Sequence, residues 1–253
     1  MTRSDDLARI EDALDAAEMV LADFTSGDIA STRKSGGSPL TEADLAVNDA
    51  LRSILPETGE GWLSEETADD KVRLACPRVW VVDPIDGTKE FVEGIPEWCV
   101  SIGLVEDGQP VAGGIVNPAT NERVIGAVGV GVTTSGTTPA PLDRKVTVGA
   151  SRSEVDRGEW VRFSGLDLEI VTSGSVAYKL ALVAAGVLDA TWTLVPKHEW
   201  DVAGGAALVL ASGGWVANKD GTPRTWNQPT PWLPGFIATS SAARQKVSDL
   251  LLT

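Results

Sequence analysis

Two aspartates, spaced three apart, directly follow a short run of β-branched and aromatic residues. The run is Val79–Val82, and the aspartates are Asp83 and Asp86. Such a run predicts a buried strand, and Pro84 and Gly87 predict a tight turn at its end. The two carboxylates would repel each other if they lay close together without a partner, so we expect a cation between them.

The same turn offers groups that suit a phosphate. Asp86, Gly87 and Thr88 provide in order a carboxylate, an unobstructed backbone and a hydroxyl. A metal ion and a phosphate can be held together by such a combination. The turn is therefore the first candidate for a functional site.

Other carboxylates stand where they could join this group. Asp201 opens a predicted helix after a strand and a proline turn, and Glu65 and Glu66 end a short apolar segment. Each has a structural alternative, because Asp201 can cap the helix and the glutamates can lie in solvent. Asp44, in the capping pattern Thr41–Asp44, either stabilises a helix N-terminus or contributes to the site.

The types of the candidate ligands restrict the metal. His198 is the only histidine, and beside Glu199 it is more typical of a surface or packing residue than of a catalyst. No spacing selects partners for a Ser-His-Asp triad, and no glycine pattern matches a nucleotide-binding fingerprint. Cys76 and Cys99 are too few and too far apart for a disulfide framework or a zinc site. Oxygen ligands favour Mg²⁺ or Mn²⁺.

Composition excludes several classes of protein. The net charge of −15 over 253 residues argues against a nucleic-acid binder, although a bound metal would still allow a small anionic substrate. No uncharged apolar run of about 18 residues predicts a membrane span. The first residues lack the apolar core of a signal peptide, and two cysteines suit a reducing compartment, so we expect a cytoplasmic protein.

The elements that must position these groups can be read in order. Apolar residues at steps of three and four predict a helix capped by Ser4 and stopped by Gly27, and a second helix is expected over 41–55. Between them, 31–39 reads as a polar loop. After the central strand, alternation around Asp107–Gly108 predicts a hairpin. Its strands are 100–105 and 111–116, with a third antiparallel strand at 122–128.

Residues 129–142 are rich in glycine, threonine and proline and show no periodicity. We therefore place a boundary near residue 140, with an N-terminal α+β subdomain at 1–140 and a C-terminal α/β subdomain at 141–253 that completes a cleft. The second part alternates strands and helices, which implies an α/β layer. The expected strands are 146–149, 168–171, 188–194, 215–217 and 236–238, and the expected helices 176–185, 201–211 and 240–252.

Taken together, these motifs resemble the inositol monophosphatase superfamily of Mg²⁺-dependent, lithium-sensitive phosphatases. The resemblance rests on Asp83-Pro84-Ile85-Asp86-Gly87-Thr88, on Trp200-Asp201-Val202-Ala203-Gly204 and on Ser64-Glu65-Glu66 upstream. It implies an α/β (α+β) fold, the layered αβαβα sandwich of the sugar phosphatases, with metals in a cleft between its halves. Homodimers are common in the superfamily, so a homodimer is a possible assembly.

The resemblance also implies a ligand set for two or three Mg²⁺ ions, with Mn²⁺ as a possible substitute. One ion would be held by Glu65, Asp83 and the Ile85 carbonyl, and a second by Asp83, Asp86 and Asp201. Glu66 and Asp44 would lie near a third, weaker site.

The implied reaction is hydrolysis of a phosphomonoester by a metal-activated water. Thr88, hydrogen-bonded toward Asp44, would orient and deprotonate that water, with Glu65 as a further catalytic group. Backbone N–H groups at Gly87 and Thr88 would bind phosphate oxygens.

Four features resemble the 3′(2′),5′-bisphosphate nucleotidase branch, which dephosphorylates 3′-phosphoadenosine 5′-phosphate. They are Lys89-Glu90-Phe91, Ser151-Arg152-Ser153, Lys179, and Leu194 in place of a glutamate that binds inositol hydroxyls. Lys179 and Arg152 would then bind the substrate, unless they are solvated surface residues. Glu154 departs from the branch, which has a histidine there. The alternatives are an inositol or sugar phosphate phosphatase, or a regulator that binds metal or nucleotide without turnover.

Overall fold

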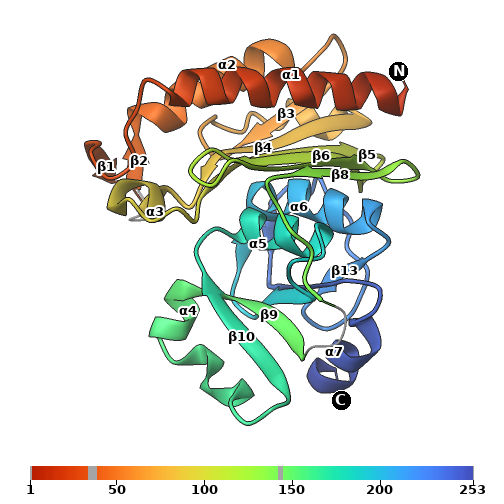
Figure 1. The fold of residues 1–253 in the computed structure, drawn as a ribbon. Coiled ribbons are helices and arrows are strands. Elements are labelled where there is room, and N and C mark those ends of the chain that lie inside the picture. Colours follow the sequence, from red (N-terminus) through yellow and green to blue (C-terminus); the bar gives the residue numbers. More distant parts are fainter. Residues whose placement is uncertain (1, 34–38, 142–144, 253) are drawn as a thin grey trace.

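The chain forms five alternating layers of helices and sheets in a computed structural model that describes residues 2–33, 39–141 and 145–252. Helices α1 (Arg3–Leu21) and α2 (Glu42–Ile54) cover one face of a six-stranded sheet (Figure 1). Helices α5 (Val176–Ala184) and α6 (Glu199–Ala211) separate it from a five-stranded sheet, and α7 (Arg244–Leu251) lies beyond. The predicted layered α/β fold is confirmed.

The first two helices begin at capping boxes. Thr2, not the predicted Ser4, caps α1, because its hydroxyl accepts the Asp5 N–H while the Asp5 carboxylate accepts the Thr2 N–H. Thr41 caps α2 in the same way with Asp44, as predicted. The prediction of a polar loop over 31–39 is wrong at both ends, because β1 (Ser31–Arg33) pairs with β2 (Pro39–Thr41) there, and residues 34–38 lie outside the described part.

The six-stranded sheet has the order β3-β4-β5-β6-β7-β8, and its centre is β4 to β6. The predicted hairpin is confirmed, with Asp107 (φ 49°) and Gly108 (φ 74°) in the left-handed turn that such short connections favour. Only β3 and β4 run parallel. The strands are β3 (Gly61–Ser64), β4 (Arg78–Asp86), β5 (Cys99–Glu106), β6 (Gln109–Asn117), β7 (Glu122–Ala127) and β8 (Gly131–Ser135).

Strand β8 corrects the expectation that residues 129–142 form no element. Gly131–Ser135 pairs with β7 over five residues at the edge of the sheet. Its side chains are mostly exposed, so its sequence shows no apolar alternation that would predict a strand. The strand forms because its backbone pairs with β7. The predicted boundary near residue 140 lies between the last strand of this sheet and the first of the next, and it stays a prediction.

The second sheet has the order β10-β9-β11-β15-β13 and contains the five predicted strands. β9, β10 and β11 are parallel, and β13 and β15 are antiparallel to their neighbours. The terminal helix begins at Arg244, four residues later than predicted. The bounds are β9 (Val146–Ser151), β10 (Leu168–Ser173), β11 (Ala190–Thr193), β13 (Trp215–Asn218) and β15 (Phe236–Thr239).

Besides β1, β2 and β8, the sequence predicts no bounds for six further short elements. They are η1 (Val72–Ala75), α3 (Thr88–Glu93), α4 (Arg152–Asp156), η2 (Glu159–Phe163), β12 (Lys197–His198) and β14 (Trp232–Leu233). Each is at most six residues long, which is too short for a periodic pattern to reveal. None of the described helices is both long and apolar enough to span a membrane.

Helix α6 packs unusually close to the first sheet, which fixes its N-terminus near the end of β4. A Cβ atom at Gly204 would lie 2.7 Å from the Ile102 carbonyl oxygen, and one at Gly113 would lie 2.4 Å from the Gly204 carbonyl oxygen. The absence of side chains here lets the two backbones touch. Gly205 makes the same kind of close approach to Leu180 of α5.

Candidate active site

Three aspartates meet where β4 ends and α6 begins. Carboxylate oxygens of Asp83, Asp86 and Asp201 all lie within 4.8 Å of one another. Asp83 and Asp86 flank an irregularity in the pairing of β4 with β5, and Asp201 stands in the first turn of α6. A register shift of this kind redirects side chains, so both strand residues face Asp201.

Burial makes this group electrostatically unfavourable without a cation. Asp83 and Asp86 are buried, and burial together with the charges of Asp86 and Glu65 raises the pKa of Asp201 to about 8. Carboxylates that share a small dry volume cannot all ionise unless a positive charge joins them. Three hard oxygen ligands converging in this way fit a divalent cation such as Mg²⁺.

Asp201 also caps a helix, which is the structural alternative that the sequence allowed for it. Its carboxylate accepts the His198 N–H at 2.9 Å, in the position of a helix-capping residue. The His198 ring stacks on Trp200 with centroids 4.4 Å apart and meets Trp232 edge-on. His198 thus has the packing role expected of it, and Asp201 serves the helix and the acidic group together.

The second carboxylate of the group is oriented by the other half of the chain. Asp86 Oδ2 accepts the Ser175 hydroxyl at 2.7 Å and the Ala177 backbone N–H at 2.5 Å, both at the start of α5. Ser175 also caps α5 through the Tyr178 N–H and has a left-handed backbone with φ 32°. Sequence reasoning missed Ser175, although a serine directly before an apolar helix is a recognisable cap signal.

Thr88 and Asp44 are brought together as predicted. The Thr88 hydroxyl lies 3.2 Å from Asp44 Oδ1 and 3.0 Å from the Ile85 carbonyl oxygen. Asp44 Oδ2 meanwhile accepts the Thr41 N–H and hydroxyl at 2.8 and 2.6 Å. Asp44 therefore both caps α2 and holds the Thr88 hydroxyl, so its two alternative roles coexist in one side chain.

The two glutamates lie beside the end of β4. Glu65 follows β3, which pairs in parallel with β4, and its N–H donates to the Val82 carbonyl at 3.3 Å. The Glu66 N–H donates to the Ser64 hydroxyl at 3.2 Å. Glu65 is close enough for its charge to raise the pKa of Asp201, but it is not within the three-aspartate group.

The turn after β4 needs a glycine. Gly87 has φ 96°, and a Cβ there would lie 3.0 Å from the Glu97 carbonyl oxygen. This left-handed residue ends β4 and begins α3, which leaves the backbone of Gly87 and Thr88 beside Asp86.

Lys179 is placed differently from the expectation. Its side chain is buried, and its ammonium donates to the carbonyl oxygens of Ser173, Gly174 and Ser175 at 3.4, 2.5 and 2.6 Å. Burial lowers the pKa of Lys179 to about 8. Because an ammonium has three N–H donors, this geometry gives no support to a bond with a phosphate, and Lys179 instead supports the turn that carries Ser175.

Arg152 lies at the rim of the same turn. Its guanidinium pairs with Glu97, whose carboxylate also accepts the Gly174 N–H at 2.6 Å. Glu90 packs against Gly174, and burial followed by the charge of Asp86 raises its pKa. From the sequence, Glu90 was recognised only as part of the Lys89-Glu90-Phe91 motif and Glu97 was not singled out, because only the fold brings α3 and the 94–98 segment against residue 174.

Comparison with known proteins agrees with this geometry. The sequence model of the inositol monophosphatase family matches residues 4–247. A 3′-phosphoadenosine 5′-phosphate phosphatase of Mycobacterium leprae is 36% identical over 83% of this chain and 79% of its own length. The inositol-1-monophosphatase ImpA of Mycolicibacterium smegmatis is 33% identical over 97% of this chain and 91% of its own.

Among solved structures, CysQ from Bacteroides thetaiotaomicron, described as a bacterial member of the inositol monophosphatase family, has a TM-score of 0.77 at 29% identity. The alignment covers 93% of this chain and 97% of that one. The family model matches nearly the whole chain, and the two relatives are 36% and 33% identical over most of its length. The chain therefore belongs to the inositol monophosphatase family and is a phosphatase.

Proposed function

We propose that the chain is a Mg²⁺-dependent phosphomonoesterase whose preferred substrate is 3′-phosphoadenosine 5′-phosphate, from which it removes the 3′-phosphate. The observation that carries the catalytic part is the convergence of three aspartate carboxylates within 4.8 Å of one another, with Asp83 and Asp86 buried and Asp201 half-buried. The substrate is inferred from the relative of Mycobacterium leprae, which is named for this activity. Leu194 agrees with this choice, since its side chain cannot accept a hydrogen bond from an inositol hydroxyl.

The residues that would hold Mg²⁺ are Asp83, Asp86 and Asp201, to which the family resemblance adds Glu65 and the Ile85 carbonyl. Two or three ions would fit the ligand set, with Glu66 and Asp44 near the last. When bound, Mg²⁺ neutralises charge on the phosphate and lowers the pKa of a water molecule.

The protein's own groups would orient the reaction. Thr88 donates its hydroxyl hydrogen to Asp44, so the Thr88 oxygen could take a proton from the attacking water only while its own proton passes to the Asp44 carboxylate, which is the final acceptor. Ser175 and the Ala177 N–H fix the Asp86 carboxylate. The N–H groups at Gly87 and Thr88 would bind phosphate oxygens, and Arg152, at the rim, would meet a second phosphate by exchanging its partner Glu97.

A second candidate is hydrolysis of an inositol or sugar phosphate. The relative named inositol-1-monophosphatase is aligned over 97% of this chain, more than the nucleotide phosphatase. Because both substrates are phosphomonoesters, the same acidic group would serve either one, and the choice depends on residues away from the metals.

The deciding experiment is phosphate release by the purified protein with Mg²⁺, comparing 3′-phosphoadenosine 5′-phosphate, inositol 1-phosphate and fructose 1,6-bisphosphate. We expect the nucleotide to exceed the others by about tenfold or more in kcat/KM, which is about 1.4 kcal/mol of transition-state binding. Preference for inositol phosphate would replace the first candidate by the second. Addition of Li⁺ to the same assay tests the expected lithium sensitivity.

A further inference from the structure

The turn that carries Ser175 is enclosed by groups from both halves of the chain. It spans residues 173–175, between β10 and α5. From its own half, the Lys179 ammonium binds the three carbonyl oxygens of the turn. From the other half, the Glu97 carboxylate accepts the Gly174 N–H at 2.6 Å. The position of the Ser175 hydroxyl therefore depends on the groups that hold this turn.

Glu90 of α3 lies directly against the same turn. A Cβ atom at Gly174 would lie 2.6 Å from Glu90 Cγ and 2.7 Å from Glu90 Cδ, closer than side-chain carbons approach one another. It would also lie 2.8 Å from the Glu97 carbonyl oxygen. Only a residue without a side chain lets the turn come this near to α3 and to the segment that follows it. The stem of Glu90 thus forms a surface on which the turn rests.

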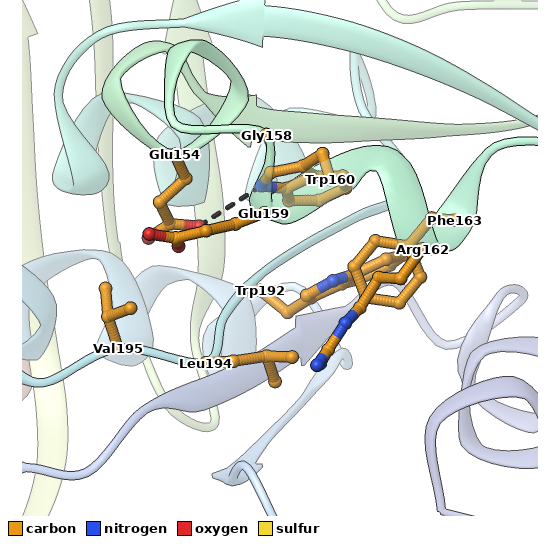
Figure 2. A pocket seen from close by; sticks show the side chains of 9 residues that line it. All are labelled: Glu154, Gly158, Glu159, Trp160, Arg162, Phe163, Trp192, Leu194 and Val195. Atoms are coloured by element: carbon orange, nitrogen blue, oxygen red, sulfur yellow. Dashed lines mark hydrogen bonds between the residues drawn. The ribbon is translucent and has the colours of Figure 1, made fainter.

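Among the described residues, Glu90 differs from the two other buried glutamates, Glu154 and Glu199, in how its carboxylate is bonded. The Glu154 carboxylate accepts the Trp160 N–H at 3.1 Å, as Figure 2 shows, and Glu199 pairs with an arginine at 2.9 Å. The Glu90 carboxylate is bonded by its own backbone N–H and, within the described part of the chain, by no other element. Packing of its stem, rather than a hydrogen bond, therefore makes the contact with Gly174.

The turn connects this contact to a candidate metal ligand. Ser175 donates its hydroxyl to Asp86 Oδ2 at 2.7 Å, and Ala177 donates its N–H to the same oxygen at 2.5 Å. Both donors follow Gly174 within three residues, so a displacement of Gly174 would displace them. Partners that orient a metal ligand contribute to the affinity of the site for its ion.

We propose that Glu90 is a positioning residue for the metal site. By packing against Gly174 it seats the 173–175 turn, so that the two donors beyond the turn meet Asp86. The glutamate of the Lys89-Glu90-Phe91 motif thereby acts on the metal site without touching the substrate. This inference rests on the proposed function, because it takes the ion held by Asp86 to be Mg²⁺.

Two substitutions separate the shape of Glu90 from its charge. Glu90→Ala removes the packed stem, and we expect Mg²⁺ affinity, measured by isothermal titration calorimetry without substrate, to fall by about tenfold, the lower end of the effect of losing an outer partner. Glu90→Gln removes the charge and keeps the stem, so its affinity should stay close to that of the wild type. Equal losses in the two variants would assign the effect to charge and overturn the inference.

The matched control is Glu93→Ala. Glu93 is exposed on the same helix, so its substitution removes the same charge without touching the turn. We expect the Mg²⁺ affinity of Glu93→Ala to equal that of the wild type. Equal affinities in Glu90→Ala and Glu93→Ala would overturn the inference.

A double substitution tests the route by which Glu90 acts. If Glu90 acts through the turn, Glu90→Ala should weaken Mg²⁺ binding less in a Ser175→Ala background than in the wild type, because the partner that it positions is already gone. Additive losses would overturn the inference, since Glu90 would then reach the metal site by another route.

Amide hydrogen exchange in the metal-free protein gives a readout that needs neither Mg²⁺ nor substrate. The N–H groups of Ala177 and Tyr178 are bonded to Asp86 and to the Ser175 hydroxyl. In Glu90→Ala both should exchange faster than in the wild type, while amides in the middle of α6 keep their rates. Equal acceleration in α6 would mean general destabilisation and would contradict a positioning role.

The proposed function and the positioning role fail separately. A wild-type protein that neither binds Mg²⁺ nor releases phosphate would refute the proposed function, and amide exchange would still decide whether Glu90 seats the turn. A wild type that binds Mg²⁺ and releases phosphate, with no loss of affinity in Glu90→Ala, would refute the positioning role alone.

Discussion

The Ser175 hydroxyl lies 2.7 Å from Asp86 Oδ2 and joins the two halves of the chain at the acidic group. Asp86 ends a strand of the first sheet, whereas Ser175 stands between the second sheet and α5. Together with the Ala177 N–H, this hydroxyl orients a candidate metal ligand and links the two halves at the site.

Ser175→Ala tests this relationship. It removes a partner that orients a metal ligand, so we expect kcat/KM and Mg²⁺ affinity to fall by about 10–100-fold. The matched control is Ser153→Ala, because Ser153 is exposed and its hydroxyl bonds that of Ser151, away from Asp86. Steady-state kinetics over a Mg²⁺ titration measure the effect. Equal Mg²⁺ affinity in the two variants would show that Asp86 does not need Ser175.

Asp83→Asn tests the metal assignment itself. It keeps the shape of the side chain and removes a negative charge from the three-aspartate group. We expect hydrolysis to be abolished and Mg²⁺ binding, measured by isothermal titration calorimetry, to weaken strongly because an amide is a poorer ligand than a carboxylate. The metal-free protein should be no less stable than the wild type, since one repulsive charge is gone. Unchanged hydrolysis would refute the assignment.

Lys179→Met separates support of the turn from phosphate binding. Methionine fills a similar buried space and leaves three carbonyl groups without their donor, so we expect a loss of about 1–3 kcal/mol in unfolding free energy. Because Lys179 acts through the turn at Ser175, kcat/KM should fall by the same factor for a bisphosphate and for a monophosphate. A selective loss on the bisphosphate would restore the role predicted from the sequence.

The low pKa of Glu60 predicts how the free energy of unfolding depends on pH. Burial alone would raise its pKa, but hydrogen bonds from Arg9, Trp80, the Glu57 N–H and Arg78 lower it to about 2. The unfolded chain then binds more protons between that value and the ordinary 4.5, so stability falls as pH drops through this interval. Thermal unfolding between pH 2 and about 6 should show this slope, and Glu60→Gln should flatten it.

At neutral pH, Glu60→Gln should lower the free energy of unfolding. Glu60→Gln weakens the hydrogen bonds that Arg9, Arg78 and Trp80 donate to residue 60, while both arginines keep the buried Asp6, so we expect a loss of about 1–3 kcal/mol. The control is Glu57→Gln, since Glu57 is 55% exposed and pairs with Arg9 at 3.5 Å, so its loss should be about 0–1 kcal/mol. Similar losses in both variants would mean that the ion pairs around Glu60 are no stronger than a surface pair.

Much of this protein could be predicted from local sequence. The central strand, the hairpin at Asp107–Gly108 and the small-residue helices followed from patterns that depend on near neighbours. Asp83 and Asp86 were recognised as partners because both carboxylates stand where a strand ends, and the resemblance to the inositol monophosphatase superfamily added Asp201, at the start of a helix, to them. Those positions are determined by residues within a few places along the chain.

Tertiary structure decided what the other groups contact. Ser175 and Lys179 stand four residues apart at one turn, yet only the packing of α5 under β4 directs the hydroxyl to Asp86 and the ammonium to carbonyl groups. Strand β8 exists because β7 offers it an edge, and Trp160 and Phe163 meet Trp192 because η2 folds over β11. Such contacts join residues far apart in the chain, so the free energy that selects them is absent from any local pattern.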